Sequence, residues 1–552
     1  MPSATPFPAW EGRRAVTGAE AEATALLGWL TDPEAPRLCL VTGAAGSGKT
    51  ALLGWLAAHG ARAARARARR RPARVLVPLA GQSALGAAWT IANHLGVVAA
   101  TPDDLVDALA TGEDRRTGRA VLLLTDLHAA AEPEALTELI TQLAGVGRVR
   151  LVVEARTGTP GPAALRAAAR RVTLVDLEGE PAPDTGGTPP EPAARPLPDL
   201  SDPVAVCAAD PLLVTTGYAT EARPGTPGSP DGPAGDPHGG LRTAWLRAGQ
   251  ALCRDQTPEE RAAVLLAALG DGADPRARPA LTALAEGAAW RVRWTRARGD
   301  LTPPWPGPVA VLGAAGGPQE GLLLVGDRTG AVRLLHTADA SPAGRLPHEV
   351  PGRVTALAPT PDGTVLLLDE RGRLHTVGGT APRPPYLRRL TEAVSTTLTR
   401  HPGTALAAIG GSVVVGDRLG SVHAFGLTGL HQAALHSGRV TAVTALDTAT
   451  PFVCSGGADG TVRLWTPGRA PRPEPLAERA APVVSLHAAD TPRGPLVAVA
   501  WADGLVALHR PDGGPRPSFR PGPALRAVAV TGDGDLLLGT DETLVRLTPR
   551  AW

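Results

Sequence analysis

The stretch Val41–Thr50, VTGAAGSGKT, decides the fold of the N-terminal part of this 552-residue chain. The apolar run Leu38–Thr42 leads into it and is typical of a short buried strand, and a helical pattern follows from Thr50 to about residue 59. Glycines at 43, 46 and 48 give the intervening loop the freedom to curl tightly. The stretch therefore predicts a strand, a glycine-rich loop and a helix in immediate succession.

The loop has the spacing Gly43-x-x-x-x-Gly48-Lys49-Thr50, which between a strand and a helix indicates a phosphate-binding loop. Its backbone N–H groups and the start of the helix favour phosphate oxygens. Lys49, the only lysine in the sequence, is expected to reach the β and γ phosphates, and Thr50 to offer its hydroxyl to Mg²⁺. Arginine's planar fork cannot replace a compact ammonium in so tight a loop. The predicted nucleotide-binding residues are Gly43, Ala44, Ala45, Gly46, Ser47, Gly48, Lys49 and Thr50.

Strand-like and helix-like patterns alternate over residues 16–180. Apolar runs predict further strands at 75–79, 121–125, 149–153 and 172–177, with helical patterns between them at 84–95, 102–110, 133–144 and 163–170. This alternation predicts an α/β domain with a parallel sheet covered by helices on both faces.

Two charged residues end predicted strands. Asp126 ends the run VLLLT, a Walker B pattern, and is expected to hold Mg²⁺ through water or through Thr50; the alternative is an Asp that caps the next turn. Arg156, after LVVEA, is expected to reach the γ-phosphate; the alternative is an ordinary surface arginine. Glu154 and His128 lie nearby in the sequence, but each is interpreted as structural, so no general base is assigned.

From about residue 305 the pattern changes to short β-rich runs, and helical periodicity is no longer expected. A strand, a turn with Gly and Asp, and a second strand recur at 322–336, 365–377, 413–425, 453–465, 497–509 and 536–548. The turn glycines 330, 372, 420, 460 and 504 are 42, 48, 40 and 44 residues apart, the period of propeller blades. Six units are counted, and a seventh would be completed if Trp290–Trp294 paired with the C-terminal strand.

Composition narrows the class of protein. The 55 basic and 53 acidic residues nearly balance, which disfavours a protein that binds nucleic acid or membranes over its whole surface. The four cysteines are far apart, so neither disulfides nor a zinc site is expected. No apolar run approaches the roughly 20 residues of a membrane helix, and the N-terminus lacks the pattern of a signal peptide, so a cytoplasmic protein is expected. The basic stretch Arg62–Arg74 holds seven arginines but no aromatic residues, and is interpreted as a solvated loop.

The chain resembles the STAND-class NTPases of the NACHT or NB-ARC type, in the actinobacterial form with WD repeats behind the NTPase domain. The resemblance rests on Val16–Glu20, Leu26–Leu30, VTGAAGSGKTALLGWL at 41–56, Thr101–Leu105 before the Walker B strand, and Arg156 at the family's sensor position. Gly456–Trp465 closely resembles the end of a WD repeat. The chain is thus expected to be multidomain: a tail (1–15), a P-loop NTPase domain (16–180), a Pro-rich linker (181–200), a small helical domain (201–300) with a disordered insertion (222–240), and a propeller of six or seven blades (305–552).

The resemblance implies an ATP- and Mg²⁺-dependent signalling switch whose propeller binds a protein partner, with self-oligomerisation on activation. The family usually has an acidic pair shortly after its Walker B Asp, whereas this chain continues Leu127-His-Ala-Ala130, so slow or absent ATP hydrolysis is expected. The first motif also departs, with Gly18-Ala-Glu20 in place of Gly-Arg-Glu. One alternative is a WD-repeat scaffold with a vestigial nucleotide site. A second alternative is a nucleic-acid-associated NTPase that uses the arginines of residues 62–74.

Overall fold

The computed structural model describes residues 19–66, 74–111, 120–169, 171–177, 196–220, 237–300, 307, 309–347, 350, 352–379, 385–427, 429–448, 451–514, 516–522 and 525–550. The chain forms two compact units, Met1–Pro230 with Cys253–Gln256, and Asp231–Leu252 with Thr257–Trp552. The predicted tail, most of the Pro-rich linker, most of the 222–240 insertion and most of the arginine stretch lie outside the described residues. None of the described helices is both long and apolar enough to cross a lipid bilayer.

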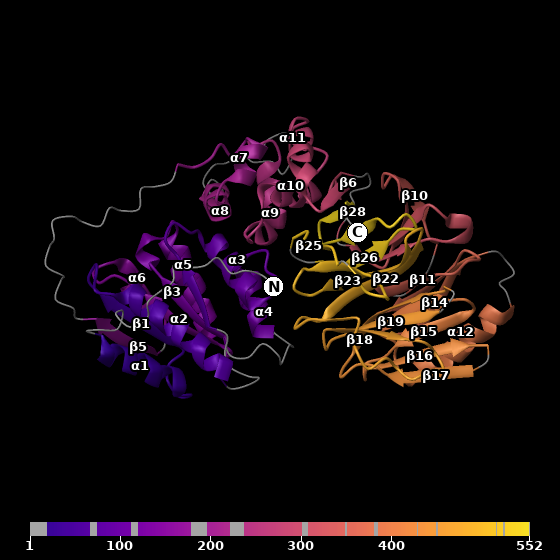
Figure 1. Ribbon diagram of the computed structural model, residues 1–552, viewed down its shortest axis with the longest axis horizontal. Coiled ribbons are helices and arrows are strands. Elements are labelled where there is room, and N and C mark those ends of the chain that lie inside the picture. The colour runs from indigo at the N-terminus through magenta and orange to yellow at the C-terminus, as the bar shows by residue number, and fades with distance from the viewer. Residues whose placement is uncertain are drawn as a thin grey trace. The chain divides into compact units, whose positions relative to one another are not determined.

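The first unit is built on a parallel sheet of five strands in the order β2-β3-β4-β1-β5 (Figure 1). The strands are β1 (Leu38–Gly43), β2 (Arg74–Pro78), β3 (Ala120–Thr125), β4 (Val149–Glu154) and β5 (Val172–Leu177). Every residue of β1, β3 and β4 is buried, as expected when helices cover both faces of a sheet. The predicted parallel sheet is therefore confirmed.

Alternate residues of each strand enter two different cores. Cys39 and Val41 of β1 pack with the helices α1 (Glu20–Thr31) and α2 (Lys49–Ala66) on one face. Leu38 and Leu40 pack on the other face, which is covered by α3 (Ala84–Leu95), α4 (Pro102–Thr111), α5 (Pro133–Gly145) and α6 (Pro160–Ala168). Each fully buried leucine contributes about 2 kcal/mol to this sandwich.

Two short helices complete the first unit: α7 (Pro203–Ala208) and α8 (Pro211–Thr220). The Thr216 hydroxyl donates to the carbonyl of Gly81 at 3.2 Å and accepts from the backbone N–H of Ser83 at 3.3 Å. The Tyr218 hydroxyl, which is buried, donates to the carbonyl of Leu200 at 2.7 Å. These bonds fasten α8 beside the start of α3, so α7 and α8 belong with the sheet.

The described residues of the second unit form six antiparallel sheets, which we call blades 1 to 6 in chain order (Figure 1). Their strands are β7 (Val309–Ala314), β8 (Leu322–Asp327), β9 (Val332–His336) and β10 (Pro342–Arg345); β11 (Val354–Pro359), β12 (Thr364–Asp369) and β13 (Leu374–Gly378); β14 (Ala405–Ile409), β15 (Ser412–Gly416), β16 (Ser421–Gly426) and β17 (Gly429–Ala434); β18 (Val440–Leu446), β19 (Phe452–Gly457), β20 (Thr461–Trp465) and β21 (Ala477–Glu478); β22 (Val483–Thr491), β23 (Gly494–Trp501), β24 (Val506–His509) and β25 (Ser518–Phe519); and β26 (Ala527–Val530), β27 (Leu536–Gly539), β28 (Thr543–Pro549) and β6 (Trp290–Ala297).

The first strands of the blades form a closed ring. Each of β7, β11, β14, β18, β22 and β26 contacts the next, and β26 returns to β7. The ring encloses a channel of about 510 Å³ lined mainly by small residues of these six strands. Radial repetition of this kind leaves only short, protected sheet edges, which is the physical advantage of a propeller.

Blade 6 is completed by a strand from before the propeller. β6 pairs antiparallel with β28, and the register includes Thr295 opposite Val545. The predicted pairing of Trp290–Trp294 with the C-terminal strand is confirmed. The expectation that this pairing would complete a seventh blade was wrong, however. β6 supplies the fourth strand of blade 6, and the described residues form six blades.

Blade 2 departs from the predicted all-β pattern. It has three strands, and the helix α12 (Pro385–Leu398) follows β13 where the other blades have a fourth strand. Leu390, Val394 and Leu398 of α12 are buried against residues of blades 2 and 3. The expectation that helical periodicity ends at about residue 305 was therefore wrong. The spacing of these apolar residues at i, i+4 and i+8 is the helical signal that was overlooked.

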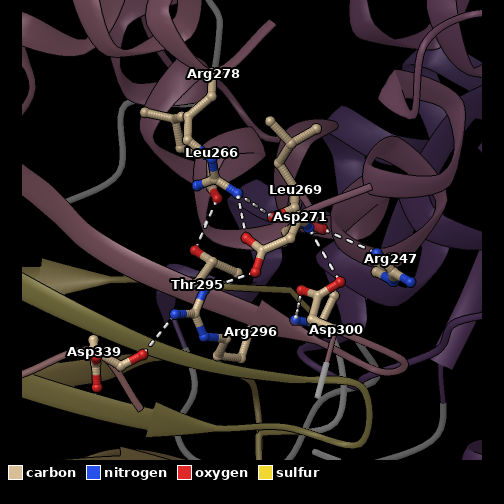
Figure 2. Close-up of polar contacts among 11 residues, drawn as sticks. Arg247, Leu266, Leu269, Asp271, Arg278, Thr295, Arg296, Asp300 and Asp339 are labelled. Atoms are coloured by element: carbon tan, nitrogen blue, oxygen red, sulfur yellow. Dashed lines mark hydrogen bonds and ion pairs between the residues drawn. The ribbon is translucent and has the colours of Figure 1, made fainter. Parts of the chain in front are cut away.

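Helix α10 (Pro258–Ala268) packs on β6 and β28 of blade 6, and α9 (Leu241–Leu252) and α11 (Ala277–Leu284) pack on α10. Figure 2 shows polar contacts that join these elements. The buried Thr295 hydroxyl donates to the carbonyl of Leu266 at 3.0 Å. Arg296 forms an ion pair with Asp271 at 2.7 Å and donates to the carbonyl of Asp339 at 2.6 Å. Arg247 of α9 pairs with Glu542 at 2.9 Å. The helices predicted as one domain over 201–300 thus divide between the two units, α7 and α8 in the first and α9 to α11 in the second.

Candidate functional site

The candidate site lies at the carboxyl ends of β1 and β4, which are neighbours in the sheet. The chain leaves β1 toward α2 on one face and leaves β4 toward α6 on the other face. The two loops therefore diverge, which makes this edge the topological switch point where open α/β sheets bind ligands. The loop after β1 carries the predicted residues 43–50.

The backbone of this loop requires its glycines. Gly46 and Gly48 have φ of 78° and 86°, a left-handed conformation that suits residues without a Cβ. A Cβ on Gly43 would lie 2.9 Å from the carbonyl oxygen of Leu177, so this glycine allows β5 to approach the loop. A Cβ built on Gly46 or Gly48 would meet no atom within 4 Å, so the loop is open beside these two positions.

Lys49 begins α2 and is 95% buried, with a relative exposure of 5%. Its Nζ donates to the carbonyls of Gly43 and Ala44 at 3.1 and 2.6 Å and to Oγ of Ser47 at 3.2 Å. Burial lowers the pKa of Lys49 from its ordinary value, whereas the negative charge of Glu154 raises it. The ammonium is thus held by oxygen atoms of its own loop, at the N-terminus of α2.

Glu154 ends β4 and makes a direct contact with the loop. Its Oε1 accepts a hydrogen bond from the Thr50 hydroxyl at 2.9 Å, while its Oε2 is buried and has no hydrogen-bond partner. Burial first, and then the negative charge of Asp126, raise the pKa of Glu154 to about 7, although the Thr50 hydrogen bond and the charge of Lys49 lower it. From the sequence alone, Glu154 is interpreted as structural and is not predicted as a site residue. The signal that could have found it is a carboxylate at the end of a strand adjacent to β1.

Asp126 follows β3 in an unusual conformation, with φ of 57° and ψ of 38°. It precedes the 3₁₀ turn Leu127–Ala129, but its side chain makes no capping hydrogen bond there, so the alternative of a turn-capping Asp is wrong. Its charge raises the pKa of Lys49, Glu154 and His128. Asp126 therefore lies close to the loop, but the hydroxyl of Thr50 bonds to Glu154 and not to Asp126.

Arg156 and His128 border the same edge. Arg156 is exposed, and its positive charge lowers the pKa of both Lys49 and His128. The backbone N–H of Thr157, next to Arg156, donates to the carbonyl of Gly43 at 3.2 Å and so joins the loop after β4 to the loop after β1. The structure thus brings Lys49, Thr50, Asp126 and Arg156 to one edge, together with Glu154, which was not predicted as a site residue.

These residues suit a magnesium-bound phosphate chain. The first N–H groups of α2 have no acceptor within the helix and point toward the loop. In the described part of the chain, no group of three or more His, Cys, Asp or Glu side chains could hold a metal ion by itself. Magnesium is normally held by one or two carboxylates together with phosphates and waters, and the unpartnered Glu154 Oε2 is an oxygen of that kind.

The second unit carries a different polar cluster, in blade 4. The buried His436 bonds through Nδ1 to Asp459 Oδ1 at 3.1 Å and through Nε2 to Ser455 Oγ at 2.8 Å. Asp459 lies in the turn before β20 and also accepts from the backbone N–H of Thr461 at 3.0 Å. Trp465, at the end of β20, is buried and donates to the carbonyl of Arg469 at 2.9 Å. These bonds lock the turn to the segment that enters β18.

Comparison with known proteins agrees with the second unit's architecture. Residues 431–466 match the family described as WD domain, G-beta repeat, which includes the predicted repeat end Gly456–Trp465. No curated protein matches the sequence.

Three solved structures resemble the chain weakly. The WD40 beta propeller domain of Doa1 is 12% identical over 47% of this chain and 97% of that chain, with a TM-score of 0.33. The beta-propeller domain of Myceliophteria thermophila Cps50 (Swd1) is 10% identical over 44% and 97%, with a TM-score of 0.33. The computationally designed Ika8 protein is 19% identical over 43% and 70%, with a TM-score of 0.28. These TM-scores are too low to support an argument. The assignment of a propeller is therefore based on the six sheets of this chain and on the matched repeat. The C-terminal part of this protein is a WD-repeat β-propeller.

Proposed function

We propose that the first unit binds ATP with Mg²⁺ and acts as a nucleotide-dependent switch, in the manner of the STAND-class NTPases that it resembles. The observation that carries the proposal is the buried ammonium of Lys49 at the start of α2, inside a loop open at Gly46 and Gly48. A compact cation, helix N–H groups and a glycine backbone together favour a bound anion such as a phosphate chain. Mg²⁺, when bound, supplies positive charge between the phosphates.

The residues of the chain have separate tasks in this proposal. The loop 43–48 orients the phosphates, Lys49 pairs with their charge, and the Thr50 hydroxyl and the nearby carboxylates face the metal. Arg156 lies at the rim, where its charge would detect the γ-phosphate. The turn after Asp126 contains Leu127, His128 and Ala129, and none of these is a carboxylate. Hydrolysis is therefore expected to be slow, and the bound nucleotide rather than its turnover sets the state of the switch.

The experiment compares Mg-ATP and Mg-ADP binding by calorimetry for the wild-type protein and for Lys49→Ala and Lys49→Arg. Both variants are expected to weaken ATP binding at least about 100-fold, because the ammonium is lost in one and misfits the loop in the other. Arg37→Ala, away from the site, is the matched control because Arg37 donates to the carbonyl of Gly145. Equal affinity of the wild type and Lys49→Ala would contradict nucleotide binding at this loop.

We further propose that the propeller is a platform for a protein partner. The turns and inter-blade segments at one end of blades 2 to 4 support this role. Gly403 N–H donates to the carbonyl of Gly372 at 3.2 Å, the Thr404 hydroxyl donates to the carbonyl of Val440 at 2.6 Å, and Val440 N–H donates to the carbonyl of Asp417 at 2.9 Å. The exposed Arg371, Arg418 and Arg439 are the sequence neighbours of Gly372, Asp417 and Val440, which these bonds join.

The chemistry of that surface favours an acidic partner. Arg371, Arg418 and Arg439 are exposed and, within the described residues, form no ion pair. Leu419, beside Arg418, is 79% exposed and offers an apolar contact among the cations. We call these four residues the arginine surface. An acidic protein segment with an apolar side chain fits it better than nucleic acid, because no aromatic residue is present there for stacking on bases.

The alternative is a WD-repeat scaffold with a vestigial nucleotide site. It is favoured by the absence of a carboxylate in Leu127–Ala129 and by the bonds that tie Lys49 to its own loop. A partner that binds equally well to the wild type and to Lys49→Ala, with and without ATP, would select this alternative. The nucleic-acid alternative depends on the arginines of residues 62–74, most of which lie outside the described residues.

A further inference from the structure

We propose that Glu154, rather than the Walker B residue Asp126, is the carboxylate that anchors Mg²⁺ at this site. The inference rests on the proposed binding of a magnesium nucleotide. It reassigns the metal-anchoring role from β3 to β4, the strand that adjoins β1. Three independent features of Glu154 support it: the hydrogen bond to Thr50, the unpartnered oxygen and the place of β4 in the sheet.

The first feature is the direction of the Thr50 hydroxyl. A threonine hydroxyl has one proton to donate, and here it points to Glu154 Oε1 at 2.9 Å. This bond turns the lone pairs of the hydroxyl oxygen away from Glu154 and leaves them available to a cation. A carboxylate that accepts from a metal-binding hydroxyl fixes its orientation and lies beside the same ion. Asp126 makes no such bond with Thr50.

The second feature is the other carboxylate oxygen. Glu154 is only 3% exposed, and its Oε2 is buried with no hydrogen-bond partner. A buried polar atom of this kind is costly, and such atoms are rare in folded proteins unless a ligand, an ion or a water satisfies them. A hydrated Mg²⁺ beside Thr50 would satisfy Oε2 directly or through one of its waters.

The third feature is the strand order. Val41 of β1 is paired with Glu154 itself, so the carboxylate is one strand away from the loop 43–50. β3 pairs with β4 and β2, which places Asp126 one strand further from the loop. Asp126, whose side chain makes no capping hydrogen bond, acts on Lys49 and Glu154 as a second negative charge.

The experiment measures how much Mg²⁺ strengthens ATP binding by the full-length protein. ATP affinity is determined with excess Mg²⁺ and with EDTA for the wild type, Glu154→Gln, Asp126→Asn and Lys49→Ala. Binding of Mn²⁺ in the presence of ATP is followed by electron paramagnetic resonance as a direct readout of the metal. Both acid-to-amide changes keep the size of the side chain, and thermal melting establishes that each variant is folded.

Glu154→Gln is expected to lose about 10- to 100-fold of the enhancement of ATP affinity by Mg²⁺, because metal-anchoring partners have effects of this size. Asp126→Asn is expected to lose less than about threefold. Glu154→Asp, which keeps the charge on a shorter side chain, is expected to be intermediate. The reverse ranking of Glu154→Gln and Asp126→Asn, or equal losses in both, would overturn the assignment while leaving nucleotide binding intact.

The proposed function fails in a different way. If the wild type binds no ATP in either condition, or if Lys49→Ala binds as the wild type does, nucleotide binding at this loop is refuted and the assignment of Glu154 falls with it. A Lys49→Ala variant that binds ATP more weakly than the wild type but keeps the magnesium enhancement, while Glu154→Gln loses that enhancement, would support the metal-anchoring role.

Discussion

His509, on β24 of blade 5, is a buried ionisable residue whose ring makes no hydrogen bond. It is 3% exposed, neither ring nitrogen has a hydrogen-bond partner, and its ring lies edge-on to Trp501 with centroids 5.9 Å apart. Burial, and then the positive charge of Arg516, lower the pKa of His509 to about 4 from 6.5. The imidazole is therefore kept neutral by its surroundings, in contrast to His436, which is satisfied by Asp459 and Ser455.

The depressed pKa of His509 predicts a loss of stability in mild acid. The unfolded state takes up a proton near pH 6.5 and the folded state only near pH 4. The stabilisation is therefore complete above about pH 6.5, is lost as the pH falls toward 4, and amounts to about 3 kcal/mol. His509→Phe is expected to flatten the dependence of the melting temperature on pH between 7 and 4. His431→Gln, at an exposed histidine, should leave the slope unchanged; an unchanged slope in His509→Phe would refute the role of this residue.

At the scale of elements, β6 and α12 show two ways in which sheets of this propeller end. β6 gives β28 an outer partner, and α12 follows β13 in place of an outer strand. The pairing with β6 satisfies backbone groups of β28 that would otherwise be exposed, whereas α12 packs in the core between blades 2 and 3. In the chain, β6 follows α11 and precedes the first strand of blade 1. The helices α9 to α11 therefore belong to the same folding unit as the propeller, and the ion pair between Arg296 and Asp271 supports this grouping.

The closure by β6 predicts a large effect of a single substitution. Thr295→Pro loses the buried bond to Leu266 and fixes φ near −65°, away from the extended backbone of a strand, and is expected to cost at least about 3 kcal/mol in unfolding free energy. Thr295→Val keeps the shape and the ladder and loses only the side-chain bond, so a loss of about 1 kcal/mol is expected. Denaturant unfolding and limited proteolysis near residue 300 measure both. Equal stability of the two variants would show that β6 does not close the propeller in solution.

At the scale of the whole molecule, the two units differ in the kind of surface that they present. The first unit offers a loop edge with a buried cation and carboxylates, and the second offers a rigid ring of turns with exposed arginines. Neither unit needs the other for its core, since each has its own hydrophobic clusters. A switch built from them would act through the nucleotide state of one unit and the partner bound to the other.

The arginine surface predicts that charge reversal abolishes partner binding. Arg371→Glu combined with Arg418→Glu and Arg439→Glu is expected to weaken the capture of an acidic peptide by at least about 30-fold, with a strong dependence on salt in the wild type. The matched control reverses Arg469, Arg472 and Arg493, which are exposed at the opposite ends of their strands. Fluorescence anisotropy with a poly-glutamate peptide that contains leucine measures both. Equal losses of affinity in the two variants would indicate attraction by net charge alone. Binding of a nucleic-acid probe but not of the peptide would contradict the proposal of an acidic protein partner.

Local sequence patterns alone determined most of the elements of this protein. The parallel strands, the loop 43–50 and the six hairpins follow from periodicity and glycine spacing, which are properties of short segments. The pairing of Trp290–Trp294 with the C-terminal strand follows instead from the need to close sheet edges. Only the tertiary structure decided that β6 completes a sixth blade, that a helix follows β13, and that Glu154 meets Thr50. Those outcomes depend on which strands become neighbours, and a carboxylate 104 residues away from its partner along the chain carries no local signal of that contact.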